Sequence, residues 1–476
     1  MNTLLIIAKG EWLIMVRNKI ALALLLVFSF ILILAAYIGI DNTLKQHAFR
    51  QQYQTEVQNQ WMSQPDRHPH RVAHYGYLAF REKSSLSFFD FGIETFVGNS
   101  VFLEAHRQNT INLSEAGFSN GMLRFGELSM ALVLQLLVPL FIFFVGFGSI
   151  AGLRENGVLK IILSQGISMK TLLWGKILGI FSYSAAFFLS LILLAFLGSV
   201  IFMPVSLDQD YLIRVGLIVF LYATYFGLCS WAAVMVSAFS KKAGTALISL
   251  IIIWMVAGVI LPKVAQTIGT GIYPSISKLD FEKDIEEDLS KEGDSHNPDD
   301  VHYAAFKAET LQEYGVETVD DLPFNYSGYV MAEGERITSN LFNKHFDKLM
   351  ATYQNQNSIA DFLSYINPYL MVRNVSMMLS GTGLEQYIDF QRQAEAYRYK
   401  QAQWLNEIHM NEIQRENDKA QRVSHTKFQN FEVFKYQPPR LAGAFPDQLL
   451  LVFSVLFWAM LSSFSVSYFS DKIPVV

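Results

Sequence analysis

Six long apolar stretches constrain the fold of this chain more than any other feature of its sequence. A bilayer core of about 30 Å requires roughly 20 consecutive, mostly apolar residues per helix. The predicted spans are residues 20–40, 128–151, 177–205, 212–238, 245–261 and 449–470. The fifth is short, and a buried helix in a soluble core is its alternative. We therefore predict an all-α polytopic membrane protein with six transmembrane helices.

The charge and cysteine content argue against a nucleic-acid-binding protein and against a fold stabilised by intrachain disulfides. The net charge of −5 and the isoelectric point near 6.1 give no basis for nucleic-acid binding. The only cysteine, Cys229, lies inside the fourth predicted span, so no intrachain disulfide can form. The first apolar run is 21 residues long, beyond the roughly 7 to 15 of a signal peptide, which favours a retained anchor.

The distribution of Lys and Arg predicts the orientation of the spans. Short cytoplasmic loops are enriched in these residues, whereas long loops translocate largely regardless of charge. With a cytoplasmic N-terminus, the cytoplasmic segments hold Lys9, Arg17, Lys19, Arg154, Lys160, Lys170, Lys176, Lys241, Lys242 and Lys472. The short loop Met203–Tyr211 on the other side holds none. Both termini are therefore predicted to be cytoplasmic, with the polar segments 41–127 and 262–448 outside.

Residues 1–19 are predicted to form an interfacial amphipathic helix. Apolar residues alternate there with Lys9, Glu11 and Arg17, and Trp12 is expected at the level of the lipid headgroups. A plain membrane anchor is the alternative.

This N-terminal region and the loop of residues 152–176 resemble the permease subunits of type-2 ABC exporters. The shared elements are Lys9, Glu11, Arg17-Asn18-Lys19, Arg154-Glu155, Gly157, Leu159-Lys160, Leu163-Ser164 and Gly175-Lys176. In that family the loop forms a coupling helix that docks on a cytoplasmic ATP-binding subunit. The resemblance implies this role for Arg154, Glu155, Gly157 and Lys160, with Gly157 permitting a sharp turn. A solvated connecting loop is the alternative.

No phosphate-binding loop is found in the chain itself. Gly175-Lys176 resembles the end of one, but Lys170 stands where a glycine is required and Ile177 where Ser or Thr is required. We therefore expect no catalytic residue and no cofactor in this chain, with ATP and Mg²⁺ bound by a partner ATPase subunit. Six spans are half of the usual twelve, so the resemblance also implies a second permease chain, identical or related.

Several residues within the spans have predicted packing roles. Gly146, Gly148 and Gly152 close the second span with small-residue spacing, and Gly148 and Gly152 form a GxxxG pattern that lets helices approach closely. Pro139 is expected to kink its helix, and Gln135 to hydrogen-bond across helices. Arg214 is expected to anchor the fourth span at the outer interface, and substrate binding is its alternative.

Three histidines in the first polar segment raise the question of a metal site. His68, His70 and His74 lie within seven residues, but no cysteine or HExxH helix accompanies them and nearby prolines favour a surface turn. No metal is predicted. The runs Leu103-Glu-Ala-His-Arg-Gln-Asn109 and Arg124-Phe-Gly126 resemble type-2 permeases with a large extracytoplasmic insert of uncharacterised function. This resemblance implies the inner (cytoplasmic) membrane of a bacterium.

The second polar segment is predicted to be mainly helical and to pack with the first as one domain. Helices are expected over 337–350 and over 359–379 with a break at Asn367-Pro368, and one or two long helices over 384–428. The acidic stretch 280–300 is interpreted as a solvated helix face or a mobile loop. The aromatic residues of the last helix are expected in a core, with a contact surface as the alternative. They are Tyr387, Phe390, Tyr397, Tyr399 and Trp404.

The leading functional prediction is a permease subunit of an ATP-driven exporter. The alternative is an ABC-type mechanotransmitter that passes force to an extracytoplasmic protein partner without moving a substrate. A membrane-bound hydrolase is a weaker third, because the spans lack paired carboxylates and a histidine-glutamate metal motif.

Overall fold

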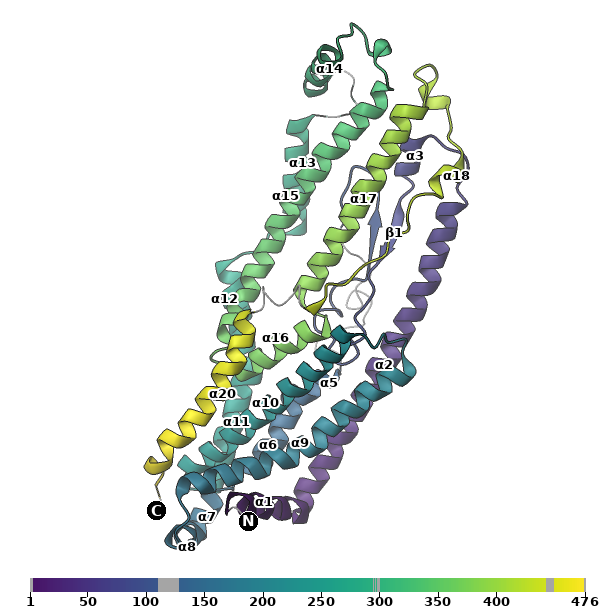
Figure 1. The fold of residues 1–476 in the computed structure, drawn as a ribbon. Coiled ribbons are helices and arrows are strands. Elements are labelled where there is room, and N and C mark those ends of the chain that lie inside the picture. The colour runs from purple at the N-terminus through teal and green to yellow at the C-terminus, as the bar shows by residue number, and fades with distance from the viewer. Residues whose placement is uncertain are drawn as a thin grey trace.

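The computed structural model describes residues 3–109, 128–293, 295, 297, 300–441 and 449–474. Within these residues helices predominate, and two short strands, β1 (Tyr77–Phe80) and β2 (Ser100–Leu103), form one antiparallel pair. The molecule is elongated, with a helical bundle at one end and a second, mainly helical region, here named the head, at the other (Figure 1). Both termini lie at the end of the bundle away from the head, named the basal end.

Six helices of the described chain are long and apolar enough to cross a membrane, which confirms the predicted number of spans. They are α2 (Lys19–Met62), α5–η2–α6–α7 (Met130–Leu132, Val133–Leu137, Val138–Gly146, Ala151–Glu155), α9 (Met169–Phe202), α10 (Gln209–Phe239), α11–η3–α12 (Ala243–Met255, Val256–Ile260, Leu261–Ile272) and α20–η7 (Leu449–Phe469, Ser470–Lys472). The short fifth apolar run lies within a helix of 30 residues. Helix α2 continues past Ile40 into the head, because polar residues with good helix propensity prolong it.

The second span contains a π-helical turn, η2, just before Pro139. Proline lacks an N–H, so the carbonyl of Gln135 loses its intrahelical donor. The Tyr225 hydroxyl donates to this carbonyl at 3.0 Å, and Trp254 Nε1 donates to the Leu136 carbonyl at 2.9 Å. The kink predicted at Pro139 is therefore a π turn whose carbonyls are satisfied by neighbouring helices. The second π turn, η3, also precedes a proline.

Large aromatic side chains fill the centre of the bundle. The fully buried ones include Phe141, Tyr183, Phe188, Tyr222 and Phe226. Edge-on, tilted and stacked contacts connect them across α6, α9 and α10, with ring centroids 5.5 to 6.4 Å apart. The centre of the bundle between α6, α9 and α10 is thus an apolar core packed with aromatic rings.

The head is built from both polar segments. Its helices are α3 (Pro69–Ala73), α13 (Lys278–Glu292), α14 (Val301–Tyr314), η4 (Val319–Asp321), α15 (Tyr326–Leu363), α17 (Leu384–Glu412), η5 (Asp418–Ala420) and α18 (His425–Phe428). Trp61 and Tyr77 from the first segment share a core with Phe390, Leu405 and Phe434 from the second. Helix α16 (Pro368–Ser380) lies between the head and the bundle, against α10 and α20.

Helix boundaries in the second segment agree with the sequence in part. The break at Asn367-Pro368 is confirmed, and none of the five predicted core aromatics is exposed. The helix expected over 337–350 is part of the longer α15, and α13 covers part of the acidic stretch. Of the one or two long helices expected over 384–428, one is present: α17 ends at Glu412, and the chain reverses through Asn417, which has a φ of +63°, before the short elements η5 and α18.

Candidate functional sites

Helix α1 (Thr3–Arg17) lies across the basal end of the bundle and packs on α9. Gly175 and Gly179 of α9 permit this contact, since a Cβ at either position would lie under 3 Å from an atom of α1. Beside them, Glu11 of α1 and Lys176 of α9 form an ion pair in which both side chains are less than 10% exposed. Helix α1 is therefore fixed to α9 by close packing and by a buried pair of charges.

The other two residues predicted at the interfacial helix differ in placement. Trp12 points into the contact with α9, where its Nε1 donates to Ser182 Oγ at 2.8 Å and its ring packs edge-on against Tyr183. Arg17 is exposed at the end of α1. Trp12 thus helps to dock α1 on α9. This role was not predicted from the sequence, which suggested a position among the lipid headgroups.

The predicted coupling loop forms two short helices, α7 and α8 (Val158–Ser164), that project from the basal end. Gly157 joins them with a φ of +72°, a conformation that residues with a Cβ rarely adopt. Glu155 and Lys160 are exposed, and so are the apolar Val158 and Ile161 of α8. This projection, defined as residues 151–164, presents a small surface of mixed charge and apolar side chains.

Arg154 differs from the other predicted coupling residues because its guanidinium is bonded within the chain. It donates to the carbonyls of Ala238 at 2.7 Å, Ser240 at 2.5 Å and Pro474 at 2.6 Å. The first two lie at the end of α10, and Pro474 follows α20 and η7. Arg154 therefore braces the projection against two other bundle helices instead of presenting its charge outward.

Ser237 of α10 closes the break between α6 and α7. Its Oγ accepts from the N–H groups of Ile150 and Ala151 at 3.1 and 3.0 Å and donates to the Phe147 carbonyl at 2.6 Å. Ser237 is fully buried. One hydroxyl thus satisfies both sides of the joint between the projection and its membrane helix.

The predicted GxxxG pair, Gly148 and Gly152, has no close neighbour within the described chain: a Cβ at either position would meet nothing within 4 Å. Close helix packing is confirmed at Gly146, where a Cβ would lie 2.7 Å from that of Ala233, and it also occurs at Gly175 and Gly179. The second pair has the same GxxxG spacing. The packing role of Gly175 and Gly179 was not predicted, because Gly175 was interpreted only as part of the Gly175-Lys176 element.

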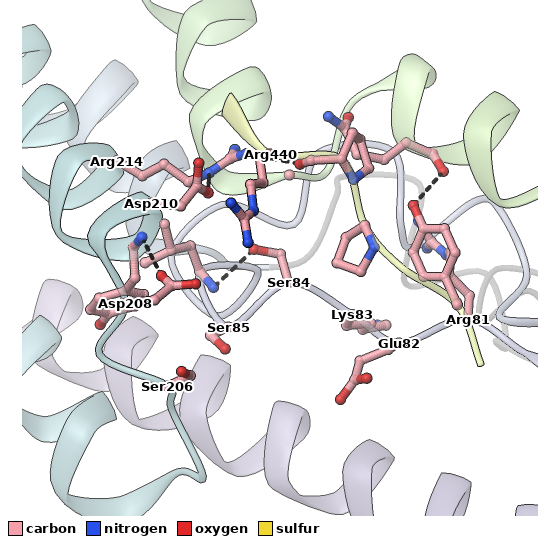
Figure 2. Close-up of a pocket in the computed structure, with 17 residues that line it drawn as sticks. Arg81, Glu82, Lys83, Ser84, Ser85, Ser206, Asp208, Asp210, Arg214 and Arg440 are labelled. Atoms are coloured by element: carbon pink, nitrogen blue, oxygen red, sulfur yellow. Dashed lines mark hydrogen bonds and ion pairs between the residues drawn. The ribbon is translucent and has the colours of Figure 1, made fainter. Parts of the chain in front are cut away.

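A polar cavity of about 270 Å³ lies where α10 meets the head (Figure 2). Arg214 in its wall donates to Asp210 Oδ2 at 2.5 Å, to the Leu379 carbonyl at 3.2 Å and to the Pro439 carbonyl at 3.2 Å. Asp210 Oδ1 accepts from the N–H of Leu441 at 2.7 Å. Arg214 thus binds carbonyls at the junction between α10 and the head, and its expected role as an anchor at the outer membrane interface stays a prediction.

A chain of buried polar groups links the bundle to this junction. Gln135 Nε2 donates to the Tyr222 hydroxyl at 2.9 Å, which lies 3.1 Å from Ser376 Oγ in α16. Ser376 Oγ donates to Asp90 Oδ2 at 2.5 Å. Burial raises the pKa of Asp90, and the hydrogen bonds from Ser376 and Gly92 offset this only in part. The predicted cross-helix bond of Gln135 is confirmed and forms part of a longer network.

The head contains a buried ionic network centred on Arg398 of α17. Its guanidinium donates to Glu335 Oε1 at 2.6 Å, to both oxygens of Glu395 at 2.7 Å and to the Glu104 carbonyl at 3.2 Å. Burial alone would raise the pKa of Glu335, but the hydrogen bond from His106 and the charge of Arg398 lower that pKa to about 2. The network fastens the loop after β2 to α15 and α17.

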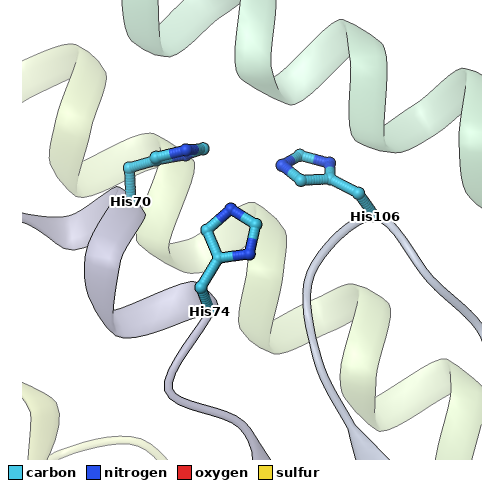
Figure 3. A group of neighbouring side chains, drawn as sticks. All are labelled: His70, His74 and His106. Atoms are coloured by element: carbon cyan, nitrogen blue, oxygen red, sulfur yellow. The ribbon is translucent and has the colours of Figure 1, made fainter. Parts of the chain in front are cut away.

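The histidines of the first segment belong to two separate groups. His70 and His74 lie beside His106 from the loop after β2, and one ring nitrogen from each lies within 4.8 Å of the others (Figure 3). His68 instead contacts Asp418 at 3.2 Å, and the ring of His409 lies beside it. Sequence proximity suggested a group of His68, His70 and His74. The pairing of β1 with β2 instead returns the chain to α3 and brings His106, rather than His68, beside His70 and His74.

Comparison with known proteins gives one finding for this chain. Residues 278–437, about a third of its length, match the family described as a domain of unknown function, DUF3526. The match covers α13 through α17 and the segment that returns toward the bundle. No curated protein matches the chain.

Proposed function

We propose that this chain is the membrane-spanning permease subunit of an ATP-driven ABC exporter, powered by ATP hydrolysis in a separate subunit. The observation that carries the proposal is the projection of residues 151–164. Its turn at Gly157 exposes Val158 and Ile161 between the charges of Glu155 and Lys160. Apolar side chains beside charges of both signs suit a groove on a protein partner.

In this proposal the basal end faces the bacterial cytoplasm and the head lies outside the inner membrane. A second permease chain completes the transport unit, and the ATPase subunits bind ATP and Mg²⁺. Their closure moves α8, and the Gly157 turn, the Arg154 brace and the Ser237 joint pass that movement to α6, α10 and α20. The Glu11–Lys176 pair carries α1 with α9.

The coupling role is tested by purifying the full chain from its native membrane with bound proteins and measuring ATP hydrolysis. Ile161→Asp should remove the ATPase subunit, because it places a charge in the apolar contact. Val301→Asp is the matched control, since Val301 is an exposed apolar residue in the head. Retention of the ATPase by the Ile161→Asp protein would refute the assignment.

Orientation is tested by labelling single cysteines in intact cells. Ser63 and Ser358 lie in the head and should react from outside, whereas Gln165 beside the projection should react only after permeabilisation. The native Cys229 is buried and gives little background. Labelling in the reverse pattern would overturn the proposed topology.

Force transmission without transport is the second candidate, and two observations favour it. Aromatic side chains fill the bundle core. Helix α2 runs unbroken for 44 residues, about 65 Å, from the basal end into the head. Such a helix can move the head as a rigid lever against an extracytoplasmic protein. Reconstituted vesicles separate the candidates: ATP-driven movement of a cargo supports the exporter, and ATP-driven movement of the head without cargo flux supports the transmitter.

A further inference from the structure

Three imidazole rings from two distant segments face one another at the side of the head. The ring centroids of His70 and His74 are 4.7 Å apart, and that of His106 lies 5.8 and 5.3 Å from them. Figure 3 shows His70 and His74 on one side and His106 reaching toward them from the opposite loop. His74 is exposed, and the other two are half-buried, so the cluster is accessible from solvent.

Local backbone structure places two of these rings on one face. Pro69 begins the short helix α3 and His68 caps it, its Nδ1 accepting from the N–H of His70 at 3.3 Å. His70 and His74 are four residues apart, and a helical turn brings such residues to the same side. Paired histidines at this spacing are a common way to bind a metal ion with two ligands.

The third ring is held by a buried carboxylate. His106 has a φ of +61°, an uncommon conformation for a residue with a Cβ. Glu335 Oε2 accepts from the N–H of His106 at 2.9 Å and lies 3.1 Å from its Nδ1. Arg398 in turn holds Glu335, whose side chain is 0% exposed. The strained backbone is therefore fixed with the ring turned toward His70 and His74.

The contact between Glu335 and His106 has the arrangement found behind metal-binding histidines. A carboxylate on Nδ1–H fixes the ring and its tautomer and leaves Nε2 to donate its lone pair to the metal. The three ligand nitrogens lie within 4.8 Å of one another. Small ring rotations bring them to the roughly 3.4 Å separation of a tetrahedral site with Zn–N bonds of about 2.0 Å.

We propose that His70, His74 and His106 bind one divalent transition-metal ion, Zn²⁺ or Cu²⁺, with Glu335 holding the His106 ring in place through Nδ1. Three neutral imidazoles select such ions over Mg²⁺ and Ca²⁺, which prefer oxygen ligands. The exposed side of His74 leaves a fourth position for water or an exchanging ligand. The bound ion ties α3 to the loop that Glu335 and Arg398 fasten to α15 and α17.

The neighbouring group of His68, His409 and Asp418 serves as an internal comparison. There the Nε2 atoms of both histidines approach the same carboxylate, at 3.2 and 2.9 Å, and Asn325 donates to it at 2.6 Å. Both histidines are buried. Their contacts with Asp418 join α3 and α17 to η5, so variants in this group test whether zinc binding is specific to His70, His74 and His106.

The test is zinc titration of the full chain, purified without a polyhistidine tag and stripped with a chelator. We expect one Zn²⁺ per chain by calorimetry and elemental analysis, and a Cu²⁺ electron paramagnetic resonance spectrum with nitrogen coupling. His74→Ala should weaken zinc binding by more than roughly 10- to 100-fold, the loss typical when a residue that hydrogen-bonds a metal ligand is replaced. His74 is exposed, so this variant should fold normally, and His106→Ala tests the ligand from the loop after β2 independently.

Two further variants make the result specific. His302→Ala removes an exposed histidine of α14 and His409→Gln alters the comparison group, and neither should change zinc affinity. The proposal is overturned if the unaltered chain binds no zinc, or if His74→Ala and His106→Ala both bind as tightly as the unaltered chain. It is also overturned if His409→Gln alone abolishes binding. The site does not depend on the proposed function, because none of these measurements requires ATP or a partner.

Discussion

The bundle and the head use polar side chains in opposite ways. In the bundle, side-chain donors mostly satisfy backbone carbonyls that prolines and helix ends leave open, as Tyr225, Trp254 and Arg154 do. In the head, charged side chains bind one another, as Arg398 does with Glu335 and Glu395. The Glu11–Lys176 pair at the basal end is an exception within the bundle.

This difference in the use of polar side chains follows from the surroundings that each region suits, an apolar one for the bundle and an aqueous one for the head. An apolar surround offers no water to an open carbonyl, so a donor from a neighbouring helix stabilises each break. The head has a smaller apolar core, and its buried ionic network fixes how the two polar segments fit together. Breaks in the bundle helices are thus stabilised by individual donor side chains of neighbouring helices, whereas the head is held together by a network of paired charges.

The largest expected effect is on the Arg398 network. Arg398→Met leaves Glu335 and Glu395 buried without their cation, and loss of one partner of a buried ion pair costs about 3–5 kcal/mol. We expect a lower melting temperature and rapid proteolysis within α15 and α17. Arg392→Met is the control, because its pair with Asp347 is exposed and contributes about 0–1 kcal/mol. Equal melting of both variants would contradict the network's role.

The Glu11–Lys176 pair tests whether the stability of the basal end also depends on a buried ion pair. Lys176→Met should cost about 3 kcal/mol and release α1 to protease, because Glu11 stays buried without a partner. The double variant Glu11→Leu/Lys176→Met should recover most of the loss, since it removes both charges. Lys170→Met, at an exposed position of the same helix, is the control. An unstable double variant would show that docking needs the charges themselves.

The third prediction concerns pH and lies where α15 meets α16. Burial raises the pKa of Asp361 to about 6, although Asn374 Nδ2 donates to its Oδ1 at 2.7 Å. A folded-state pKa above the unfolded value means that the stability contribution is present below about pH 4 and is lost as pH rises through 6. Asp361→Asn stays neutral, so relative to the native chain it should gain about 1–2 kcal/mol between pH 4 and 8, allowing for partial exposure.

The measurement is the melting temperature of both proteins across this pH range. Asp347→Asn serves as the control because this carboxylate is exposed and should leave the pH profile unchanged. Parallel profiles for the native and Asp361→Asn proteins would argue against a buried, neutral Asp361.

The smallest expected effect is at Gly157. Gly157→Ala forces a Cβ into the left-handed region at a cost of about 1 kcal/mol, and Gly157→Asn should be better tolerated. We expect little change in the melting temperature of Gly157→Ala. Binding of the ATPase subunit should be weaker, because the altered turn changes the orientation of α8 relative to α7. Gly148→Ala is the control, since its Cβ meets nothing within the described chain. If Gly148→Ala disrupts association of two permease chains, the predicted GxxxG pair packs between chains.

Parts of the candidate sites were readable from sequence because they depend on local chemistry. The Gly157 turn, the cross-helix bond of Gln135 and the burial of Phe390 follow from residue type and neighbouring sequence. The role of Arg154 did not, since its acceptors lie near residues 240 and 474. The motif Arg124-Phe-Gly126 and the segment 442–448 lie outside the described residues.

The sequence by itself determined the six spans, because an apolar run of sufficient length has few other stable environments. It also determined the helical nature of the second polar segment through periodicity and the absence of Gly and Pro over 384–428. Only the tertiary structure decided which distant groups meet: Glu11 with Lys176, Arg398 with Glu335, and His106 with His70 and His74. These contacts join residues 32 to 165 positions apart, and such pairings depend on how whole elements pack rather than on any local preference.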